Sequence, residues 1–304
     1  MKAWVMMSGC VLGVVAVLAG CKALDVATQV GTSAAVAAGA INPQQAQSIQ
    51  RSTSALGKAF ENMTPEHEYY IGRSVAATIL STYKVFDQAA ATQYLNTLGA
   101  ALAMVSEKPE TFGGWHFVIM DTDEINAFAA PGGFILISRG MLRCCRNEDE
   151  LAAVLAHEIG HVQREHGLKA IKKSRWTSAF TIMASEAGKS LGGQQLAELT
   201  TLFEGSISDV TQTLVNGGYG RSSEREADAD AIVILRRIGY NPEGLFNLLA
   251  EMDKRLEKDT RGFGKTHPDR KDRLKDNRKA IGAQAPIAPH PARDARFKTA
   301  LSGI

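Results

Sequence analysis

Two histidines and a glutamate within five residues give the sequence its clearest chemical signal. They lie in the run His157-Glu158-Ile159-Gly160-His161. Histidines four residues apart lie on one face of an α-helix, a single turn apart, so two imidazole nitrogens can bind the same tetrahedral zinc ion. The glutamate follows the first histidine directly and can reach a water molecule at the metal. The pattern therefore predicts a zinc site with Glu158 as its general base.

The helix that carries this run is predicted to extend from about Glu148 to Glu165 and to be buried. Residues 154–156, 159, 160 and 162 are all uncharged, whereas a surface helix that happened to contain two histidines would have charged neighbours there. A third histidine, His166, follows His161 by five residues, which is about 140° further around a helix. It cannot share the metal face unless the helix ends first, and we expect a structural role for it.

Two histidines leave zinc short of a third protein ligand. The metzincin arrangement, with a histidine ten residues after the first, is excluded because that position is Gly167. The gluzincin arrangement takes a glutamate from a later helix, followed four residues on by an aspartate that holds a ligand histidine. Two such pairs overlap in this sequence, Glu224 with Asp228 and Glu226 with Asp230. The spacing alone is compatible with both pairs.

The residues around these pairs carry a family resemblance. Residues 219–228 read Tyr-Gly-Arg-Ser-Ser-Glu-Arg-Glu-Ala-Asp. This segment resembles the glutamate helix of metallopeptidase family forty-eight, the CAAX prenyl protease and HtpX family, in which the first glutamate of a Glu-x-x-Ala-Asp pattern binds the metal. The resemblance implies that Glu224 is the third ligand and that Asp228 holds a ligand histidine.

A second segment extends the resemblance, which runs from about Thr64 to Ile281. Residues 126–133, Asn-Ala-Phe-Ala-Ala-Pro-Gly-Gly, are similar to the family's edge strand beside the catalytic helix, on which a substrate backbone can pair. The residues that the resemblance implies for substrate pairing are Asn126, Ala127, Phe128 and Ala129. A strand followed by a Pro-Gly turn also occurs for purely structural reasons, and this reading remains open.

A third segment, Thr266-His267-Pro268, is similar to the family's late His-Pro element. In some periplasmic relatives the histidine of this loop approaches the metal. The resemblance implies that His267 is a fourth ligand or a group that stabilises the transition state. Tyr219 and Arg221 are further candidates for stabilising the transition state, since the charge on a tetrahedral intermediate needs a donor besides the metal.

The first twenty residues have the pattern of an export signal. Met1 and Lys2 precede an apolar run over residues 3–18, which ends in Leu18-Ala19-Gly20-Cys21. This tetrapeptide resembles the lipobox of bacterial lipoproteins, which implies cleavage before Cys21 and lipidation of its thiol. An uncleaved signal anchor is the alternative, because a tilted helix of about this length can just span a bilayer. Lys22 favours the outer membrane, by resemblance to enteric lipoproteins.

The remaining chain is predicted to form one domain. Residues 21–63 are expected to be the lipidated cysteine and a tether or loose helix, residues 64–282 a zinc metallopeptidase domain, and residues 283–304 a proline-containing tail. Strand-like runs over residues 115–120 and 134–137 have helical patterns on both sides. The fold class is therefore α+β, mostly helical, with one small β-sheet, which the resemblance places next to the helix of His157 and His161 in a zincin-like domain.

Helical patterns cover most of this domain. The predicted helices span residues 65–83, 87–105, 148–165, 168–188, 194–215, 222–237, 242–258 and 269–281. Cys144 and Cys145 are adjacent, so they cannot form a spaced ligand pair or an ordinary loop-closing disulfide. We expect them to be unreactive thiols, with a strained vicinal disulfide as the alternative.

Composition and motifs together favour one function. The 304 residues include 34 Lys and Arg against 32 Asp and Glu, so no basic surplus points to nucleic acid. The resemblance implies a zinc metalloendopeptidase with one Zn²⁺ per chain, anchored through Cys21 in the envelope of a Gram-negative bacterium and facing the periplasm. Its expected substrates are unfolded or misfolded envelope proteins. Two alternatives remain: a chaperone-like assembly factor that holds outer-membrane clients and cuts rarely, and a structural zinc domain, which would more often use cysteine.

Overall fold

The computed structural model describes residues 63–171, 193–255, 262–268, 270–282, 288 and 290–304, and a few isolated residues elsewhere. The chain divides into two compact units, Met1–Thr64 with Lys173–Leu199, and Pro65–Lys172 with Thr200–Ile304. The predicted signal peptide, Cys21 and most of the predicted tether lie outside the described residues. In the described part of the chain, no helix has the length and apolar character needed to cross a membrane. The second unit contains the predicted metal-site residues and is described below.

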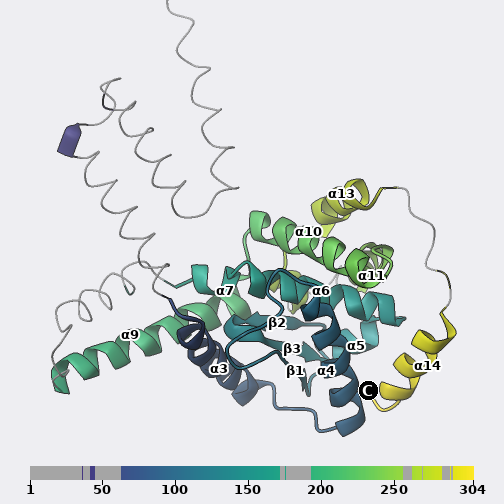
Figure 1. The fold of residues 1–304 in the computed structure, drawn as a ribbon, viewed down its shortest axis with the longest axis horizontal. Helices are drawn as coiled ribbons and strands as arrows, with labels where there is room; N and C mark the ends of the chain where they lie inside the picture. Colours follow the sequence, from purple (N-terminus) through teal and green to yellow (C-terminus); the bar gives the residue numbers. More distant parts are fainter. Residues whose placement is uncertain are drawn as a thin grey trace, which may run out of the picture. The chain divides into compact units, whose positions relative to one another are not determined.

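A small mixed sheet forms the centre of this unit (Figure 1). Its strands are β1 (His116–Met120), β2 (Ala127–Ala130) and β3 (Phe134–Ser138), in the spatial order β1-β3-β2. Strand β1 runs parallel to β3, and β2 runs antiparallel to it with Ala127 opposite Ile137. The turn η2 (Pro131–Gly133) joins β2 to β3, and its Gly132 has a φ of 71°, which favours glycine. Strand β2 is therefore an edge of this sheet.

Helices surround the sheet, as the α+β prediction requires. The helices that the structure describes are α3 (Pro65–Thr82), α4 (Ala89–Met104), α5 (Arg139–Cys144), α6 (Glu148–Gln163), α7 (His166–Lys169), α9 (Gly193–Gln212), which begins in the first unit, the π-helical η3 (Thr213–Gly217), α10 (Arg221–Ile238), α11 (Glu243–Arg255), α12 (Phe263–Thr266), α13 (Arg270–Ile281) and α14 (Pro291–Ala300). Short helices α5 and α12 have no counterpart in the prediction. The segment expected to be a tail contains α14, whose Phe297 is buried in the hydrophobic core.

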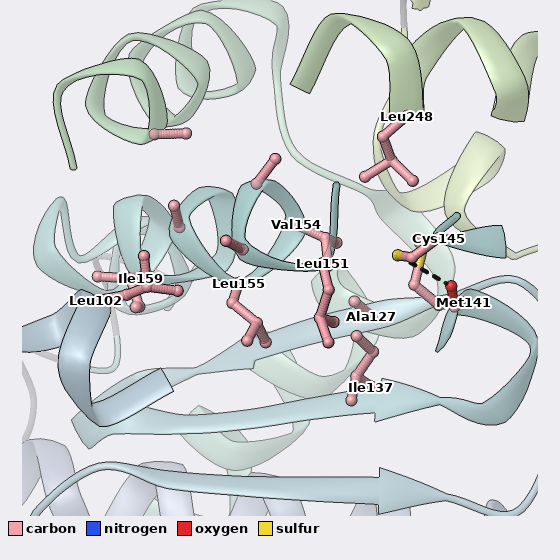
Figure 2. Packing of buried hydrophobic residues seen from close by; sticks show 14 of the residues in the cluster. Leu102, Ala127, Ile137, Met141, Cys145, Leu151, Val154, Leu155, Ile159 and Leu248 are labelled. Atoms are coloured by element: carbon pink, nitrogen blue, oxygen red, sulfur yellow. Dashed lines mark hydrogen bonds between the residues drawn. The ribbon is translucent and has the colours of Figure 1, made fainter. Parts of the chain in front are cut away.

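The main hydrophobic core lies between α6 and one face of the sheet (Figure 2). Leu151 and Leu155 on α6 point toward Ala127 and Ile137 on the strands, and Leu248 on α11 approaches α6 from its other side. Because successive strand residues face opposite ways, Phe128 points to the other face, where α3 packs. Helix α6 is thus enclosed by apolar neighbours, which explains the uncharged residues predicted to be buried.

The N-terminal end of α6 is fixed by a buried acidic group. Asn147 caps the helix by accepting a hydrogen bond from the Glu150 N–H at 2.9 Å. Glu148 is fully buried and accepts hydrogen bonds from Tyr94 at 2.9 Å and Tyr240 at 2.6 Å, and it pairs with Arg296 on α14. Negative side chains at this end also offset the helix dipole. Helices α4 and α14 are tied to α6 in this way.

The two adjacent cysteines follow the main prediction for them. Cys144 and Cys145 are free thiols and are buried. Burial raises the pKa of the Cys144 thiol to about 11, so at neutral pH it stays protonated and weakly nucleophilic. The Cys145 thiol donates to the carbonyl of Met141, as drawn in Figure 2. The strained vicinal disulfide considered as an alternative is absent.

Candidate metal centre

Helix α6 presents His157, Glu158 and His161 at the centre of the unit, where each side chain is at most 1% exposed. The two histidines lie one turn apart, and their Nε2 atoms are 3.1 Å from each other. Both ring nitrogens therefore face a common point, as their spacing predicts. The helix is capped and packed along nearly its whole length, so this point is fixed by the core.

Helix α10 crosses α6 in close contact and supplies the carboxylate of Glu224. A Cβ atom on Gly160 would lie 3.0 Å from the Cα of Ala227, so the two backbones approach because both residues are small. Glu224 is fully buried, with Oε1 3.4 Å from Nε2 of His161 and Oε2 3.6 Å from Nε2 of His157. The small residues inside both motifs thus bring the carboxylate to the histidines.

A fourth group comes from His267, which directly follows α12. Its Nδ1 lies 3.3 Å from Nε2 of His157 and 3.1 Å from Oε1 of Glu224. The ring stacks on Phe263 with centroids 4.0 Å apart, and the Phe263 N–H donates to the carbonyl of Ile125 at 2.8 Å. The loop that holds His267 is therefore attached to the segment that leads into β2.

These four groups have the geometry of a zinc-ligand set. Ligand atoms about 2.0–2.1 Å from a tetrahedral zinc ion lie about 3.3 Å from one another. The five inter-residue contacts given above range from 3.1 to 3.6 Å, with Oε2 of Glu224 nearest His157 and Oε1 nearest the other two rings, and one ligand atom from each of the four residues lies within 4.8 Å of every other. Three imidazole nitrogens and a carboxylate are also the donor types that zinc prefers. His157, His161, Glu224 and His267 could thus hold one zinc ion, with all four positions filled by protein.

A second layer of polar groups orients His157. Its Nδ1 lies 2.9 Å from Oδ1 of Asp228. The Asp228 carboxylate also accepts hydrogen bonds from the Arg273 guanidinium, at 2.6 Å on Oδ1 and 2.8 Å on Oδ2, and from the Asn277 amide at 3.0 Å on Oδ2. Burial alone would raise the pKa of Asp228, but Arg273 holds it well below its ordinary value. Arg273 also lies 2.7 Å from Oε2 of Glu224. A buried arginine on α13 therefore balances two carboxylates of α10.

The structure brings the pair Glu224 and Asp228 to the histidines and turns the overlapping pair elsewhere. Glu226 contacts the ring of His166 at 3.1 Å, and Asp230 forms two contacts of 2.7 Å with Arg164. The family resemblance implied Glu224 and Asp228 for these roles, whereas spacing alone allowed both pairs.

Glu158 lies beside the four groups without a partner of its own. It is fully buried, and among the described residues neither of its carboxylate oxygens has a hydrogen-bond partner. The nearest ring nitrogen, Nε2 of His267, is 3.7 Å from Oε1. Burial raises the pKa of Glu158, against the lowering effect of His267 and His157. A buried carboxylate with free acceptor positions is suited to accepting a proton.

The predicted substrate strand is an edge strand, but part of its edge is covered. The Ser138 N–H donates to the carbonyl of Asn126. In the alternating hydrogen-bond pattern of an antiparallel pair, the backbone N–H and C=O groups of Ala127 and Ala129 therefore point away from β3, toward the open edge. The Ala127 N–H is bonded to the side chain of Asn126 at 2.9 Å, and the Ala129 carbonyl accepts from the Tyr219 hydroxyl at 3.3 Å. Substrate pairing on this edge would replace these internal bonds.

Tyr219 links this edge to the metal ligands. Its ring stacks on His161 with centroids 4.0 Å apart and an interplanar angle of 16°. Burial raises the pKa of its hydroxyl well above the ordinary value, so the hydroxyl stays protonated and remains a donor. Tyr219 is thus better placed near the site than Arg221, which is exposed at the start of α10.

Sequence reasoning assigned no role to two residues that the structure brings to the site, and it expected only a structural role for a third. Arg273 and Asn277 lie four residues apart on α13, a helical spacing that places them on a shared face. His166 was expected to have only a structural role because a continuous helix would point it elsewhere. Its Nδ1 instead lies 2.9 Å from Nδ1 of His161.

Comparisons with known proteins agree with this geometry. A family model described as "Peptidase family M48" matches residues 89–281. The chain is 31% identical over 213 residues to a beta-barrel assembly-enhancing protease of Yersinia pestis, covering 66% of the chain and 40% of that protein. It is 27% identical over 270 residues to the protein of the same name from Escherichia coli K12, covering 86% of the chain and 53% of that protein. The chain thus spans about half the length of these curated relatives.

The similarity extends to a third relative. Metalloprotease LoiP of Escherichia coli K12 is 30% identical over 134 residues, which cover 43% of the chain and 50% of that protein. The segment matched by the family model contains both histidines, Glu158, Glu224 and His267.

Proposed function

The chain belongs to peptidase family M48, and from this membership we propose that it is a zinc-dependent metalloendopeptidase of the gluzincin type. The observation that carries the proposal is the set of four buried donor groups next to the unpartnered carboxylate of Glu158. Burying a carboxylate without a hydrogen bond is costly, and a purely structural zinc site would gain nothing from this one. Selection for chemistry accounts for its position.

The ligands in the active enzyme are His157, His161 and Glu224. Zinc held by them supplies Lewis-acid polarisation of a peptide carbonyl and of water, the chemistry that peptide hydrolysis needs. Asp228 accepts a hydrogen bond from Nδ1 of His157 and fixes the orientation of that ring. Arg273 keeps Asp228 ionised, so it remains an acceptor.

Glu158 transfers the protons of the reaction. Its carboxylate removes a proton from the attacking water and delivers one to the departing amine. The raised pKa of Glu158 suits this role, because a carboxylate with a higher pKa is a stronger base and takes a proton from water more readily. Tyr219, whose hydroxyl lies between the edge strand and the ligands, is our candidate for the donor that stabilises charge on the carbonyl oxygen.

We propose that His267 closes the site when it shares the metal with the other three ligands. If His267 were the fourth ligand, it would have to withdraw before water and a peptide could reach a metal held by the other three residues. The contacts to be broken include the stack on Phe263 and the approach to Glu224. We therefore assign His267 as a fourth ligand of a resting state, and we infer that binding of substrate or partner opens the site.

The physiological setting follows from the relatives and from the N-terminal motif. Two relatives are named for enhancing beta-barrel assembly. We propose that this chain also resides in the envelope of a Gram-negative bacterium, lipid-anchored through Cys21 with its enzymatic unit facing the periplasm, and that the outer membrane is its destination. Its proposed substrates are unfolded or misfolded envelope proteins, paired along Asn126, Ala127, Phe128 and Ala129 of the edge strand.

A holding function is the second candidate, and the closed ligand set favours it. A site filled by His267 cannot cut, yet β2 is an edge strand that supplies none of the four donor groups. The closed state could then bind an outer-membrane client without cleaving it. In this version, proteolysis is an occasional event that follows opening.

The test uses the purified full chain in detergent with an unfolded outer-membrane β-barrel protein. Glu158→Gln keeps the size of the side chain and all four donor groups, so zinc content should stay near one per chain while cleavage falls by about 10²- to 10⁴-fold. Glu165→Gln is the matched control, because Glu165 is half exposed beyond the end of α6. Its cleavage should equal that of the wild type.

Three outcomes separate the candidates. Cleavage that a chelator abolishes and that Glu158→Gln removes supports the peptidase. Client protected from aggregation but left intact by both wild type and Glu158→Gln supports holding. Cleavage undiminished in Glu158→Gln would show that another residue is the base, and the proposed mechanism would be wrong.

A further inference from the structure

We infer that His166 and Glu226 form a positioning relay for the metal ligand His161, so that each ligand histidine of α6 is oriented by its own acid on α10. The inference rests on the proposed metal site. His157 is held directly by Asp228, whereas His161 is held through the imidazole of His166, which is in turn held by Glu226. His166 and Glu226 touch neither substrate nor reacting atoms and act only through His161.

A break in the helix makes the relay possible. Helix α6 ends at Gln163, and Glu165 adopts a left-handed conformation with a φ of 56°, after which α7 begins at His166. On a continuous helix His166 would point about 140° away from His161. The break turns the ring back, so that it is buried with its Nδ1 2.9 Å from Nδ1 of His161.

The hydrogen bonds of the relay have only one consistent direction. His161 presents Nε2 to the other donor groups, so Nε2 is the atom that binds the metal and Nδ1 carries the hydrogen. That hydrogen is donated to Nδ1 of His166. The remaining ring nitrogen of His166 then carries a hydrogen and donates it to Oε2 of Glu226 at 3.1 Å. Every contact has one donor and one acceptor when His166 is neutral.

Helix α10 also stabilises the turn between α6 and α7. Asp230 receives the Arg164 guanidinium in a two-pronged contact of 2.7 Å on each oxygen, at the residue that caps α6. Asp230 lies one helical turn after Glu226 on α10. The second glutamate–aspartate pair therefore has roles of its own: Glu226 supports a ligand histidine through His166, and Asp230 fixes the backbone beside it.

The two histidine supports differ in environment. Asp228 is buried and clamped by Arg273 and Asn277, whereas the Glu226 side chain is 33% exposed. Among the described residues, the partly exposed carboxylate of Glu226 has few contacts of its own. The imidazole of His166 lies between it and His161, and through this ring Glu226 orients the buried ligand. Second-layer partners of this kind typically change metal affinity by about 10- to 100-fold when removed. That range sets the size of the expected effect.

The test measures zinc affinity by competition with a coloured chelator, on the full chain in detergent. His166→Leu removes the acceptor for Nδ1 of His161 and should weaken zinc binding by about 10- to 100-fold. His166→Asn can keep an acceptor oxygen near the position of Nδ1 and should recover most of the affinity. Arg237→Ala is the control. Arg237 lies on α10, as Glu226 does, and the change removes only an exposed ion pair with Glu107, so zinc affinity should be unchanged.

Two further measurements separate positioning from simple stability. Glu226→Ala should weaken binding less than His166→Leu, and the double variant should be no weaker than His166→Leu alone, because the residues act in series. The visible spectrum of the cobalt-loaded protein should change in His166→Leu and return toward that of the wild type in His166→Asn. A residue that only stabilises the fold would lower the melting temperature of the metal-free protein and leave the spectrum and affinity as they are.

The results distinguish this inference from the proposed function. If the wild type binds no zinc or cobalt, the metal site and the relay are both wrong. If the wild type binds zinc and His166→Leu binds it equally well, only the relay is wrong. Additive losses in His166→Leu and Glu226→Ala would also overturn it, because they would show two independent effects.

Discussion

Removing the buried arginine beside the metal ligands should strongly destabilise the metal-free fold. The Arg273 side chain is 2% exposed and lies within 2.8 Å of Asp228 and Glu224. Arg273→Met fills a similar volume but supplies no charge. Two buried carboxylates then lose their common counter-charge, and breaking a buried ion pair from one side typically costs about 3–5 kcal/mol.

The structure indicates the lower end of that range. Asp228 keeps two other hydrogen-bond donors, His157 at 2.9 Å and Asn277 at 3.0 Å, so its desolvation remains partly compensated. We therefore expect a loss of about 3 kcal/mol in the free energy of unfolding. The free energy of unfolding of Arg273→Lys should lie between those of the wild type and Arg273→Met, because a lysine keeps the charge but cannot form the two-pronged contact with Asp228.

The assay is denaturant unfolding of the full chain in the presence of a chelator, followed by circular dichroism. Arg270→Ala is the matched control on the same helix, since Arg270 makes a single, partly exposed contact with Asp253 at 3.4 Å. Its effect should stay within about 1 kcal/mol. If Arg273→Met were no more destabilised than Arg270→Ala, the proposed balance of charge in the core would be refuted.

Three further predictions test the ligand assignment, the core and the anchor. Metal analysis of purified protein should find zinc lost in Glu224→Ala but still near one per chain in Glu226→Ala at micromolar protein and excess zinc; the reverse would place the third ligand one frame later. Burial alone would raise the pKa of Glu148, but hydrogen bonds from Arg296, Tyr240 and Tyr94 hold that pKa below its ordinary value. The ionised Glu148 therefore contributes its full stabilisation above the unfolded-state pKa, and this stabilisation is lost as pH falls through the lower folded-state pKa. Thermal melts of wild type and Glu148→Gln should accordingly differ at neutral pH and converge in acid, and a constant difference would contradict this. Labelling with a radioactive fatty acid should mark the wild type and leave Cys21→Ser unlabelled and uncleaved; label that persists in the variant would exclude lipidation at this residue.

Local spacing was sufficient to predict much of the metal centre. Two histidines four residues apart must share a helix face, and the uncharged residues around them require burial, so α6 and its position in the core were evident before the structure. The strand runs were likewise short, apolar and bounded by turn residues, which predicted β1 and β3. These features depend on neighbours within a few residues, and such neighbours are readable in the chain itself.

Other features depended on contacts that no local pattern contains. Helix α13 carries six basic residues, and its composition is that of an exposed helix. Only the packing of α13 against α10 determines that Arg273 is the one buried against Asp228 and Glu224. Likewise, no isolated property of the segment after residue 282 predicted that Phe297 would join the core and that Arg296 would pair with Glu148.

The end of α6 shows most clearly where the sequence stops being sufficient. Neither Arg164 nor Glu165 is a glycine or proline, and although the helix was predicted to end at about Glu165, nothing local indicated where the ring of His166 would then point. The structure ends the helix there because Asp230, on another helix, clamps Arg164 and stabilises the turn. The sequence thus determined which side chains could perform the chemistry, since spacing along one helix is a local property. Tertiary structure decided which acid serves which histidine, since that choice depends on how two helices distant in the chain cross.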